Sequence, residues 1–317
     1  MSIKMKNLLT HLQHPNSTKD YQAEDEPDAI KISEYWGRRT YQNQKPKISF
    51  ELFPPKSDSA NKLLKKTHQK LSEINPDYFS VTFGALGLSQ NDTFDTVADL
   101  SENTKIPIIP HLTCVGIDKK QVTDLLDEYI AQGVNQIMVL KGDYPKTIIK
   151  KGDFNYANEM VEFIKENYLD INILVAAYPE KHPHSNCISK DIDFFVNKVN
   201  AGADEAVTQY FYNIDAYLHF IEEVQKRNID IPITPGIMPI TNYDQLIYFS
   251  KTCGAEIPAW ILNKLKLYKN DLNSLKEFGE DVVSEMCLKL KDNGVSSFHF
   301  YCLNKAEPTL SIVKKIT

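Results

Sequence analysis

The chain has 317 residues, of which 42% are hydrophobic and 25% charged, and its formal net charge is -6. This is the composition of an ordinary globular protein, with length for one large α/β domain or two small ones. The acidic balance argues against nucleic-acid binding, and no apolar run approaches the length of a membrane helix or the core of a signal peptide. Five widely spaced cysteines without a C-x-x-C pair argue against disulfides and a zinc ribbon, so we expect a cytoplasmic protein.

Residues 1–46 lack the hydrophobic patterning of the rest of the chain. We interpret them as an N-terminal extension that precedes one catalytic domain over residues 47–317. Met1 to Gln13 could form an amphipathic helix, whereas Pro15 to Pro27 is charged and loop-like. We expect the extension to pack on the outside of the domain or to help it associate into a homo-oligomer.

From Lys47 onward, short β-branched or apolar runs alternate with helical stretches, a pattern typical of repeated βα units. The predicted strands are Ile48–Phe53, Tyr78–Phe83, Ile108–Cys114, Gln136–Leu140, Ile173–Ala177, Glu205–Tyr210, Ile233–Ile237 and Ser297–Tyr301. The predicted helices include Ser57–Glu73, Lys119–Gln132, Tyr156–Asn167, Lys190–Ala201, Asp215–Arg227 and Gly279–Asn293. Gly133, Gly202 and Gly294 follow the ends of predicted helices, where a left-handed residue is favoured.

Eight βα units over roughly 270 residues match the size of a (β/α)8 barrel. The competing doubly wound fold usually carries G-x-G-x-x-G after a strand. The stretch Gly84-Ala85-Leu86-Gly87 does not have that spacing, and no internal linker divides the chain. We therefore predict an α/β protein built on a single TIM barrel.

Active sites of such barrels lie at the carboxyl ends of the strands, and unusual polar residues occupy those positions here. They are Glu51, Thr82, His111, Thr113, Lys141-Gly142-Asp143, Tyr178 to Pro183, Gln209, His299 and Tyr301. Each has a structural alternative, because His111 or His299 could be a hydrogen-bonded core histidine and Asp143 could begin a turn. Their common placement at one rim predicts a functional site.

Glu51 is an acid inside the apolar run that ends at Pro54-Pro55. A buried carboxyl is costly unless it is partnered or functional. Aromatic neighbours would raise its pKa and keep it protonated near neutrality, as a general acid requires. The alternative is that Glu51 is the solvent-facing residue of an edge strand.

Other chemistries leave weaker signals. The sequence contains no nucleophile elbow or P-loop. His182-x-His184 with Glu180 could bind a divalent ion, but Pro183 separates the histidines and no matching cluster occurs, so we expect no metal site. Lys141 could form a Schiff base. The adjacent Gly142-Asp143 is better suited to binding a planar heterocycle or its phosphates.

Several short motifs follow one another along the predicted barrel. They are S-F-E-L-F-P-P at 49–55, S-V-T-F-G-A at 80–85, P-H-L-T-C at 110–114, L-K-G-D at 140–143, A-A-Y-P-E-K-H-P at 176–183, A-V-T-Q-Y-F-Y at 206–212, P-G-I-M-P-I-T-N at 235–242, I-P-A-W at 257–260 and F-H-F-Y-C-L-N at 298–304. In this order they closely resemble the bacterial 5,10-methylenetetrahydrofolate reductase family over about residues 47–317. Longer eukaryotic relatives carry a C-terminal regulatory domain that binds S-adenosylmethionine, and we do not expect that regulation here.

The resemblance implies an FAD-dependent oxidoreductase of one-carbon metabolism that makes 5-methyltetrahydrofolate and so supplies methionine synthesis. It implies ping-pong kinetics, in which NADH or NADPH gives hydride to flavin N5 and leaves before 5,10-methylenetetrahydrofolate binds. The folate ring then opens to a 5-iminium cation that accepts the hydride. By the same resemblance, Glu51 protonates the leaving amine nitrogen and Asp143 supports the cation.

The resemblance also assigns binding residues. FAD would be held by Thr82, His111, Lys141, Gly142, Asp143, Tyr178, His182, Asp191 and Lys198. The folate would be bound by Gln209, Gln245, Phe249 and Lys305, with Phe249 stacking on folate or nicotinamide in turn.

Three departures from the family pattern bear on affinity. Lys141 and Lys305 stand where arginine is usual, which keeps the charge but loses the bidentate fork. Phe194 and Asn197 occupy positions that are usually polar or basic and contact FAD. These departures concern the FAD diphosphate, the adenosine and the folate anchor, and leave the expected reaction unchanged.

Two competing classes stay open. A flavin-independent or metal-dependent barrel enzyme would purify without flavin absorbance. A catalytically silent folate- or flavin-binding barrel would bind folate but leave the flavin reduced. The presence of both Glu51 and Asp143 argues against the silent class.

Overall fold

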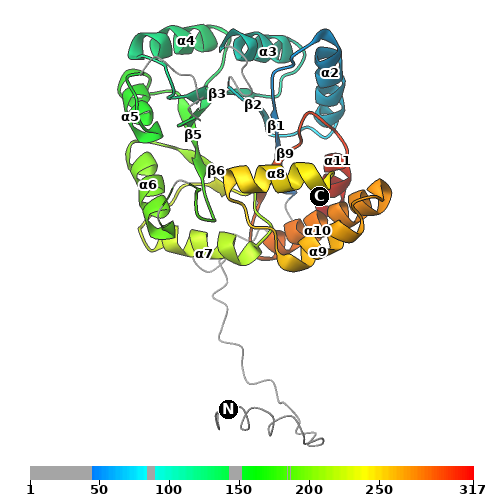
Figure 1. The fold of residues 1–317 in the computed structure, drawn as a ribbon. Helices are drawn as coiled ribbons and strands as arrows, with labels where there is room; N and C mark the ends of the chain where they lie inside the picture. The colour runs from blue at the N-terminus through cyan, green and yellow to red at the C-terminus, as the bar shows by residue number, and fades with distance from the viewer. Residues whose placement is uncertain (1–44, 84–89, 143–151, 184, 186) are drawn as a thin grey trace, which may run out of the picture. The chain divides into compact units, whose positions relative to one another are not determined.

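The structure is a computed structural model that describes residues 45–83, 90–142, 152–183, 185 and 187–317. Within these residues, parallel strands form a ring that is surrounded by helices (Figure 1). The predicted α/β barrel is confirmed. The helix predicted for Met1 to Gln13, and nearly all of the predicted extension, lie outside the described residues.

The strands follow the order β7-β6-β5-β4-β3-β2-β1-β9-β8 around the ring. Their bounds are β1 Lys47–Leu52, β2 Tyr78–Val81, β3 Ile108–Thr113, β4 Gln136–Leu140, β5 Asn172–Ala177, β6 Glu205–Thr208, β7 Ile233–Thr234, β8 Gly236–Ile237 and β9 Ser297–Tyr301. Every pairing is parallel. All predicted strands but the seventh agree with these bounds to within two residues at each end.

The seventh predicted strand, Ile233–Ile237, is interrupted at Pro235. Proline has no N–H to donate to a ladder, but its carbonyl accepts a hydrogen bond from the His299 N–H at 3.0 Å. The segment before it, β7, pairs with β6, whereas the segment after it, β8, pairs with β9. This one stretch of chain therefore closes the ring.

The helices alternate with the strands and cover the outside of the ring. Their bounds are α2 Asp58–Ser72, α3 Gln90–Glu102, α4 Lys119–Ala131, α5 Ala157–Asn167, α6 Ile188–Asn200, α7 Ile214–Gln225, α8 Tyr243–Cys253, α9 Ala259–Leu267, α10 Leu272–Asp292 and α11 Thr309–Ile316. The patterns above do not predict α3, α8, α9 and α11. The helix predicted to begin at Gly279 begins earlier, at Leu272, because Asp271 caps it by accepting the Ser274 N–H.

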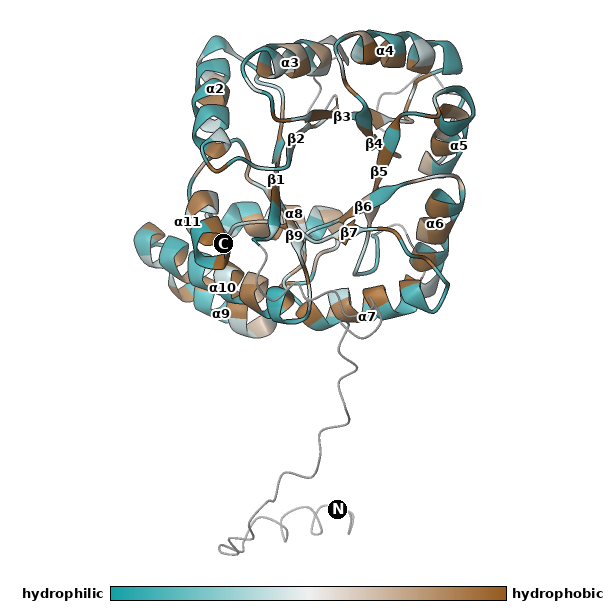
Figure 2. Ribbon diagram, turned by 180° about the vertical axis from the view of Figure 1, so that it is seen from behind, coloured by the Kyte–Doolittle hydropathy of each residue, from teal (hydrophilic) through white to brown (hydrophobic). Residues whose placement is uncertain are grey.

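Helix α4 shows how the sequence specifies these elements. Asp118 and Gln121 form a reciprocal capping box at its start. Buried residues recur at helical spacing on one side, which packs toward the strands, and Figure 2 shows hydrophilic and hydrophobic residues along each helix. The helix ends before Gly133, whose φ of 84° is the left-handed conformation predicted for that glycine.

The two faces of β1 have different roles. Ile48, Phe50 and Leu52 are fully buried between the sheet and the helices, and the Phe50 ring lies 5.8 Å from that of Phe79. Ser49 and Glu51 alternate with them and face the interior of the ring, because successive strand residues point to opposite faces. Part of that interior is filled by an apolar cluster of Ile109, Met138, Leu174 and Val207, with Tyr78 and Leu140 packed against it. Of the described helices, none is long and apolar enough to cross a membrane.

Candidate active site

Glu51 lies on a central strand of the ring. Strand β1 pairs with β2 on one side and with β9 on the other, so the alternative that Glu51 sits on an edge strand is wrong. In the register, Glu51 lies opposite Ser80 and Tyr301. Its side chain keeps 23% of its surface exposed and thus lies at the mouth of the barrel, within reach of a bound molecule.

Glu51 and His111 form an uncharged pair near neutral pH. Burial raises the pKa of Glu51 to about 8 and lowers that of His111 to about 3. The distance from His111 Nε2 to Glu51 Oε2 is 3.8 Å, which is too long for a hydrogen bond. With both groups neutral there is no ion pair, and Glu51 is a carboxylic acid that retains its proton for donation.

A second buried histidine lies deeper in the ring. His299 Nδ1 is 2.8 Å from Ser49 Oγ, and the ring stacks against Tyr78 at a centroid distance of 5.6 Å. Burial, assisted by His111, lowers the pKa of His299 to about 3. The interior beneath Glu51 is therefore polar but uncharged.

Several buried polar atoms in this region have no hydrogen-bond partner among the described residues. They are Ser80 Oγ, Thr82 Oγ1, His111 Nε2 and His299 Nε2. An unsatisfied buried donor or acceptor costs about 1–3 kcal/mol, so such atoms usually mark the place of a ligand or an ordered water. Because they lie on neighbouring strands, a molecule at the barrel mouth can reach more than one of them.

The loop after β5 and the following helix α6 together carry four of the predicted binding residues. The Tyr178 and His182 rings meet edge to face at 4.8 Å, and the His182 N–H donates to Asp191 Oδ2 at 3.0 Å. Lys198 Nζ donates to the Ala176 carbonyl oxygen and lies 5.9 Å from the Tyr178 ring centroid. Burial lowers the pKa of Lys198 to about 8, against the opposing effect of Asp191. The loop is thus anchored to α6 through Asp191, and the same helix carries the half-buried cation Lys198.

The chain after β4 approaches β3 closely. Gly142 has φ 78°, and a Cβ there would lie 2.9 Å from Thr113 Cβ, so only glycine fits without strain. Lys141 Nζ lies 5.0 Å from the ring centroid of Tyr156, which stacks on Phe194 at 6.4 Å. The departures Lys141 and Phe194 are therefore joined through one aromatic ring. Asp143 and His184 lie outside the described residues.

The predicted folate-binding residues come from three separate elements. Gln209 follows β6, and its Oε1 accepts the Tyr210 backbone N–H at 3.0 Å. Gln245 lies in the first turn of α8, where its N–H is capped by Asn242, and Phe249 lies half-buried one turn later. Lys305 is exposed after β9. In the structure's described part, no hydrogen bond, ion pair or ring contact joins these side chains to one another.

Asn304 is a structural member of the site that the sequence patterns do not single out. Its side chain accepts the Phe53 N–H at 3.0 Å and donates to the Phe53 carbonyl oxygen at 2.8 Å. It thereby fixes the chain just after Glu51. The sequence signal for this role is an asparagine soon after a strand. Its observed φ of 53° is a left-handed conformation that asparagine adopts more readily than most residues.

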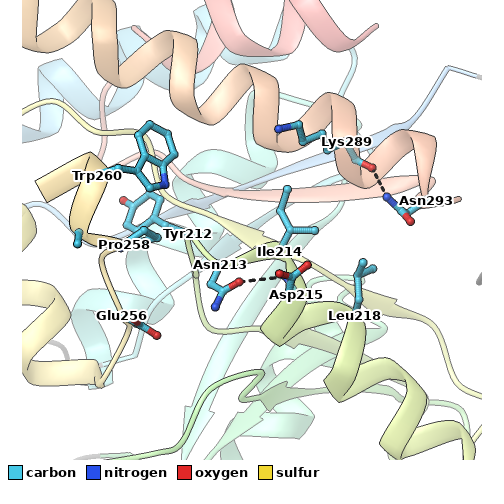
Figure 3. Close-up of a pocket in the computed structure, with 11 residues that line it drawn as sticks. Tyr212, Asn213, Ile214, Asp215, Leu218, Glu256, Pro258, Trp260, Lys289 and Asn293 are labelled. Carbon is cyan, nitrogen blue, oxygen red and sulfur yellow. Dashed lines mark hydrogen bonds between the residues drawn. The ribbon is translucent and has the colours of Figure 1, made fainter. Parts of the chain in front are cut away.

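A surface pocket of about 570 Å³ lies between α7, the segment before α9 and the end of α10 (Figure 3). Its lining includes Asn213, Asp215, Glu256, Trp260 and Lys289 and contains none of the predicted site residues. In the described part of the chain, no group of three or more His, Cys, Asp or Glu side chains could hold a metal ion.

Fold and site together define a (β/α)8 barrel enzyme with a protonated carboxyl at its mouth. A family model described as methylenetetrahydrofolate reductase matches residues 37–317. 5,10-methylenetetrahydrofolate reductase of Buchnera aphidicola subsp. Schizaphis graminum is 38% identical over 270 residues, 85% of this chain and 91% of the relative. The protein of that name from Escherichia coli is 33% identical over 265 residues, 84% and 88% of the two chains. The chain belongs to the methylenetetrahydrofolate reductase family, a family of oxidoreductases.

A more distant relative and a structural neighbour add detail. A rice protein (Oryza sativa subsp. japonica) named "Probable methylenetetrahydrofolate reductase (NADH)" is 31% identical over 283 residues, 85% of this chain and 48% of that protein. A solved structure from Clostridium thermocellum, described as binding two copies of 5-methyl-5,6,7,8-tetrahydrofolic acid, aligns with a TM-score of 0.62 at 16% identity. It covers 87% of this chain and 96% of its own, and it shows the shared fold.

Proposed function

We propose that this protein reduces 5,10-methylenetetrahydrofolate to 5-methyltetrahydrofolate with FAD as cofactor and NADH or NADPH as reductant, in ping-pong order. The observation that carries the proposal is Glu51, a buried carboxyl that keeps its proton at neutral pH and still reaches the barrel mouth. Opening the folate imidazolidine ring requires an acid of this kind, because the amine nitrogen is a poor leaving group unless it is protonated.

The residues of the mouth fit FAD. Thr82 Oγ1 and His111 Nε2 are buried polar atoms that lack partners among the described residues, as expected beside a polar ring system. Gly142 brings the backbone close without a side chain, and Lys198 supplies a cation for the diphosphate. With Lys141, Tyr178, His182 and Asp191 these residues would hold the cofactor, and Asp143 would join them.

FAD, when bound, would accept hydride from the reduced nicotinamide and would then supply it to reduce the folate. Glu51 would donate its proton to the leaving amine nitrogen. The neutral His111 leaves no positive charge beside Glu51, so the proton is not lost to an ion pair before the folate binds. We assign to Asp143 the support of the iminium cation that forms as the ring opens.

The substrates are proposed from the relatives and from the site. Relatives that share most of the chain carry the name of the folate reaction, and one distant relative carries NADH in its name. The structural neighbour from Clostridium thermocellum is described as binding the expected product. Gln209, Gln245, Phe249 and Lys305 are proposed to bind the folate, with Phe249 stacking on folate or nicotinamide in turn.

The remaining assignments are also proposals. We propose a cytoplasmic homo-oligomer with a catalytic domain over residues 47–317, preceded by an extension of uncertain role over residues 1–46. The expected metabolic place is one-carbon metabolism, where the product supplies methionine synthesis.

The deciding experiment is an absorption spectrum of the purified protein followed by anaerobic addition of NADH. We expect flavin bands that bleach with NADH and return when 5,10-methylenetetrahydrofolate is added. A colourless protein would favour a flavin-independent or metal-dependent enzyme. A flavin that bleaches but is not reoxidised by the folate would favour a silent binding protein.

A further inference from the structure

The loop after β5 and the loop between α8 and α9 meet directly beside the site. Glu180 Oε2 accepts the backbone N–H of Glu256 at 2.9 Å, although the two residues are 76 positions apart. Next to this bond, Gly254 has φ 81°, and a Cβ there would lie 3.0 Å from the Lys181 carbonyl oxygen. The two loops are thus in close backbone contact at the point that Glu180 bridges.

Each of these loops belongs to an element that carries predicted binding residues. The loop after β5 contains Tyr178 and His182. Helix α8 carries Gln245 and Phe249 and ends just before the bridged loop. In the middle of α8, Ser250 Oγ lies 3.2 Å from the Tyr210 hydroxyl of the chain after β6. The bond to Glu180 is a second attachment, beyond the carboxyl end of the helix.

Glu180 is a half-buried carboxyl that the proposed chemistry does not use. Its Oε1 atom is buried and has no hydrogen-bond partner among the described residues. Burial raises its pKa to about 7, the Glu256 N–H opposes this shift and the Glu256 carboxyl adds to it. The other titratable groups around it are Tyr210 and, through Tyr210, Cys253.

We propose that Glu180 is a positioning residue that couples the cofactor loop to α8 by holding the backbone N–H of Glu256. It sets the position of Phe249 and Gln245 relative to the barrel mouth and so controls binding of folate and nicotinamide. The identity of these ligands rests on the proposed function. The coupling itself rests only on the contact between the loops.

The cofactor loop has anchors of its own. The His182 N–H bond to Asp191 holds it from the side of α6, and the Lys198 bond to the Ala176 carbonyl oxygen holds the end of β5 just before it. Loss of the Glu180 carboxyl should therefore loosen the far loop and α8 and leave FAD retention unchanged.

The test compares Glu180→Ala, Glu180→Gln and the control Glu256→Gln. The glutamine at 180 can still accept the N–H through its amide oxygen but does not titrate, and Glu256→Gln keeps its backbone N–H. Hydrogen–deuterium exchange of residues 243–257 reports the contact without any ligand. The KM values for 5,10-methylenetetrahydrofolate and NADH, and FAD retention on dilution, report its effect on the site.

We expect Glu180→Ala to raise exchange in 243–257 and to raise both KM values about three- to tenfold, the net range of one ordinary hydrogen bond. FAD retention and kcat should change less than twofold, and Glu180→Gln should restore the KM values.

In the unmutated protein, the Glu256 amide should become better protected as pH rises through about 7, since a carboxylate accepts more strongly than its acid. Glu256→Gln should move that transition to lower pH, because it removes the nearby carboxyl that raises the pKa of Glu180.

Unchanged exchange in Glu180→Ala would show that the Glu180 carboxyl does not hold the two loops together. Increased exchange with unchanged KM values would overturn the positioning role, and parallel loss of FAD would make Glu180 part of the cofactor site instead. If the unmutated protein carries no flavin, the proposed function fails, but the exchange data still decide the coupling.

Discussion

The interior of the barrel has two unlike regions. On one side, Ile109, Met138, Leu174 and Val207 form a close-packed apolar cluster. On the other side, Ser80, His111 and His299 are at most 3% exposed and present polar atoms that have no hydrogen-bond partner among the described residues. Burial of the apolar cluster stabilises the folded state, whereas burial of the polar atoms does not.

This difference separates stability from function within one barrel interior. An apolar interior on both sides would be more stable but would provide no hydrogen-bond donors or acceptors for a polar ring system at the mouth. The polar region is also uncharged near neutral pH, because burial holds Glu51 protonated and the two histidines neutral. We therefore expect substitutions in the two regions to have opposite consequences.

The largest effect is expected for Glu51→Gln, which keeps the size and polarity of the side chain but has no proton to give. The folate-dependent half-reaction should slow by about 10²–10⁴-fold, the usual contribution of general acid catalysis. The NADH-dependent half-reaction, which needs no acid, should stay within about tenfold of the unmutated rate. Stopped-flow flavin absorbance follows the two halves separately.

Glu128→Gln, on the exposed side of α4, serves as the control and should leave both halves unchanged. Near-normal reoxidation of Glu51→Gln by methylenetetrahydrofolate would remove Glu51 from the mechanism.

Next in size is the contrast between Leu174→Ala and Ser80→Ala, one from each region. Leu174 is 1% exposed within the apolar cluster, so its truncation should cost about 2–5 kcal/mol of unfolding free energy. Ser80 is fully buried, but its hydroxyl has no partner among the described residues, so its loss should cost less than about 1 kcal/mol. Urea denaturation of both variants measures this difference, and equal losses would show that the hydroxyl is satisfied in solution.

The pH dependence of stability gives a third measure. The pKa of Glu51 is about 8 in the folded protein, above its ordinary value of 4.5, so the folded state holds this proton more tightly. Its contribution is complete below about pH 4.5 and is lost as pH rises toward 8, by at most about 1.4 kcal/mol per pH unit. Between pH 6.5 and 8, Glu51→Gln should therefore have a flatter profile of unfolding free energy than the unmutated protein. Parallel profiles would mean that Glu51 is already ionised at pH 6.5.

The smallest effect is expected at the edge of the polar region. Lys198→Ala should raise the FAD dissociation constant about tenfold, within the roughly 1–3 kcal/mol of a charged hydrogen bond. Lys190→Ala, an exposed lysine on the same helix, is the matched control. Equal FAD retention in the two variants on dilution would show that Lys198 does not contact the cofactor.

The sequence predicted the barrel well because each strand is a short apolar run and each helix has a one-sided stripe. It failed where tertiary contacts override local pattern. Gly279 was a reasonable helix boundary, yet it lies inside α10, where a Cβ would come 2.4 Å from the Ile240 carbonyl oxygen. Helix α9 escaped prediction because Trp260 and Leu267 are exposed, so its apolar residues do not form one buried stripe.

The site was predictable in part. An acid in an apolar strand indicated Glu51, and Gly142 was singled out as a binding residue, but its close approach to Thr113 was not predicted. The 3.8 Å approach of His111 to Glu51 depends on the relative register of strands that are not neighbours, which no local pattern contains. The bridge from Glu180 to Glu256 was also beyond reach, because it joins two loops of irregular conformation.

The glycine that follows Pro235 has a consequence for how the chain folds. At Gly236 the backbone passes so close to Thr208 that a Cβ would lie 2.1 Å from its carbonyl oxygen, which also accepts the Tyr301 hydroxyl at 2.7 Å. Thr208 and Tyr301 are 93 positions apart, and Ser49 and His299, which pair the first strand with the last, are 250 positions apart. Bringing such distant segments together costs loop-closure entropy that only the finished contact repays. Closing the ring therefore carries an entropic cost, and a residue larger than glycine at position 236 would add steric strain at this seam, because its Cβ could fit only if the Thr208 backbone moved.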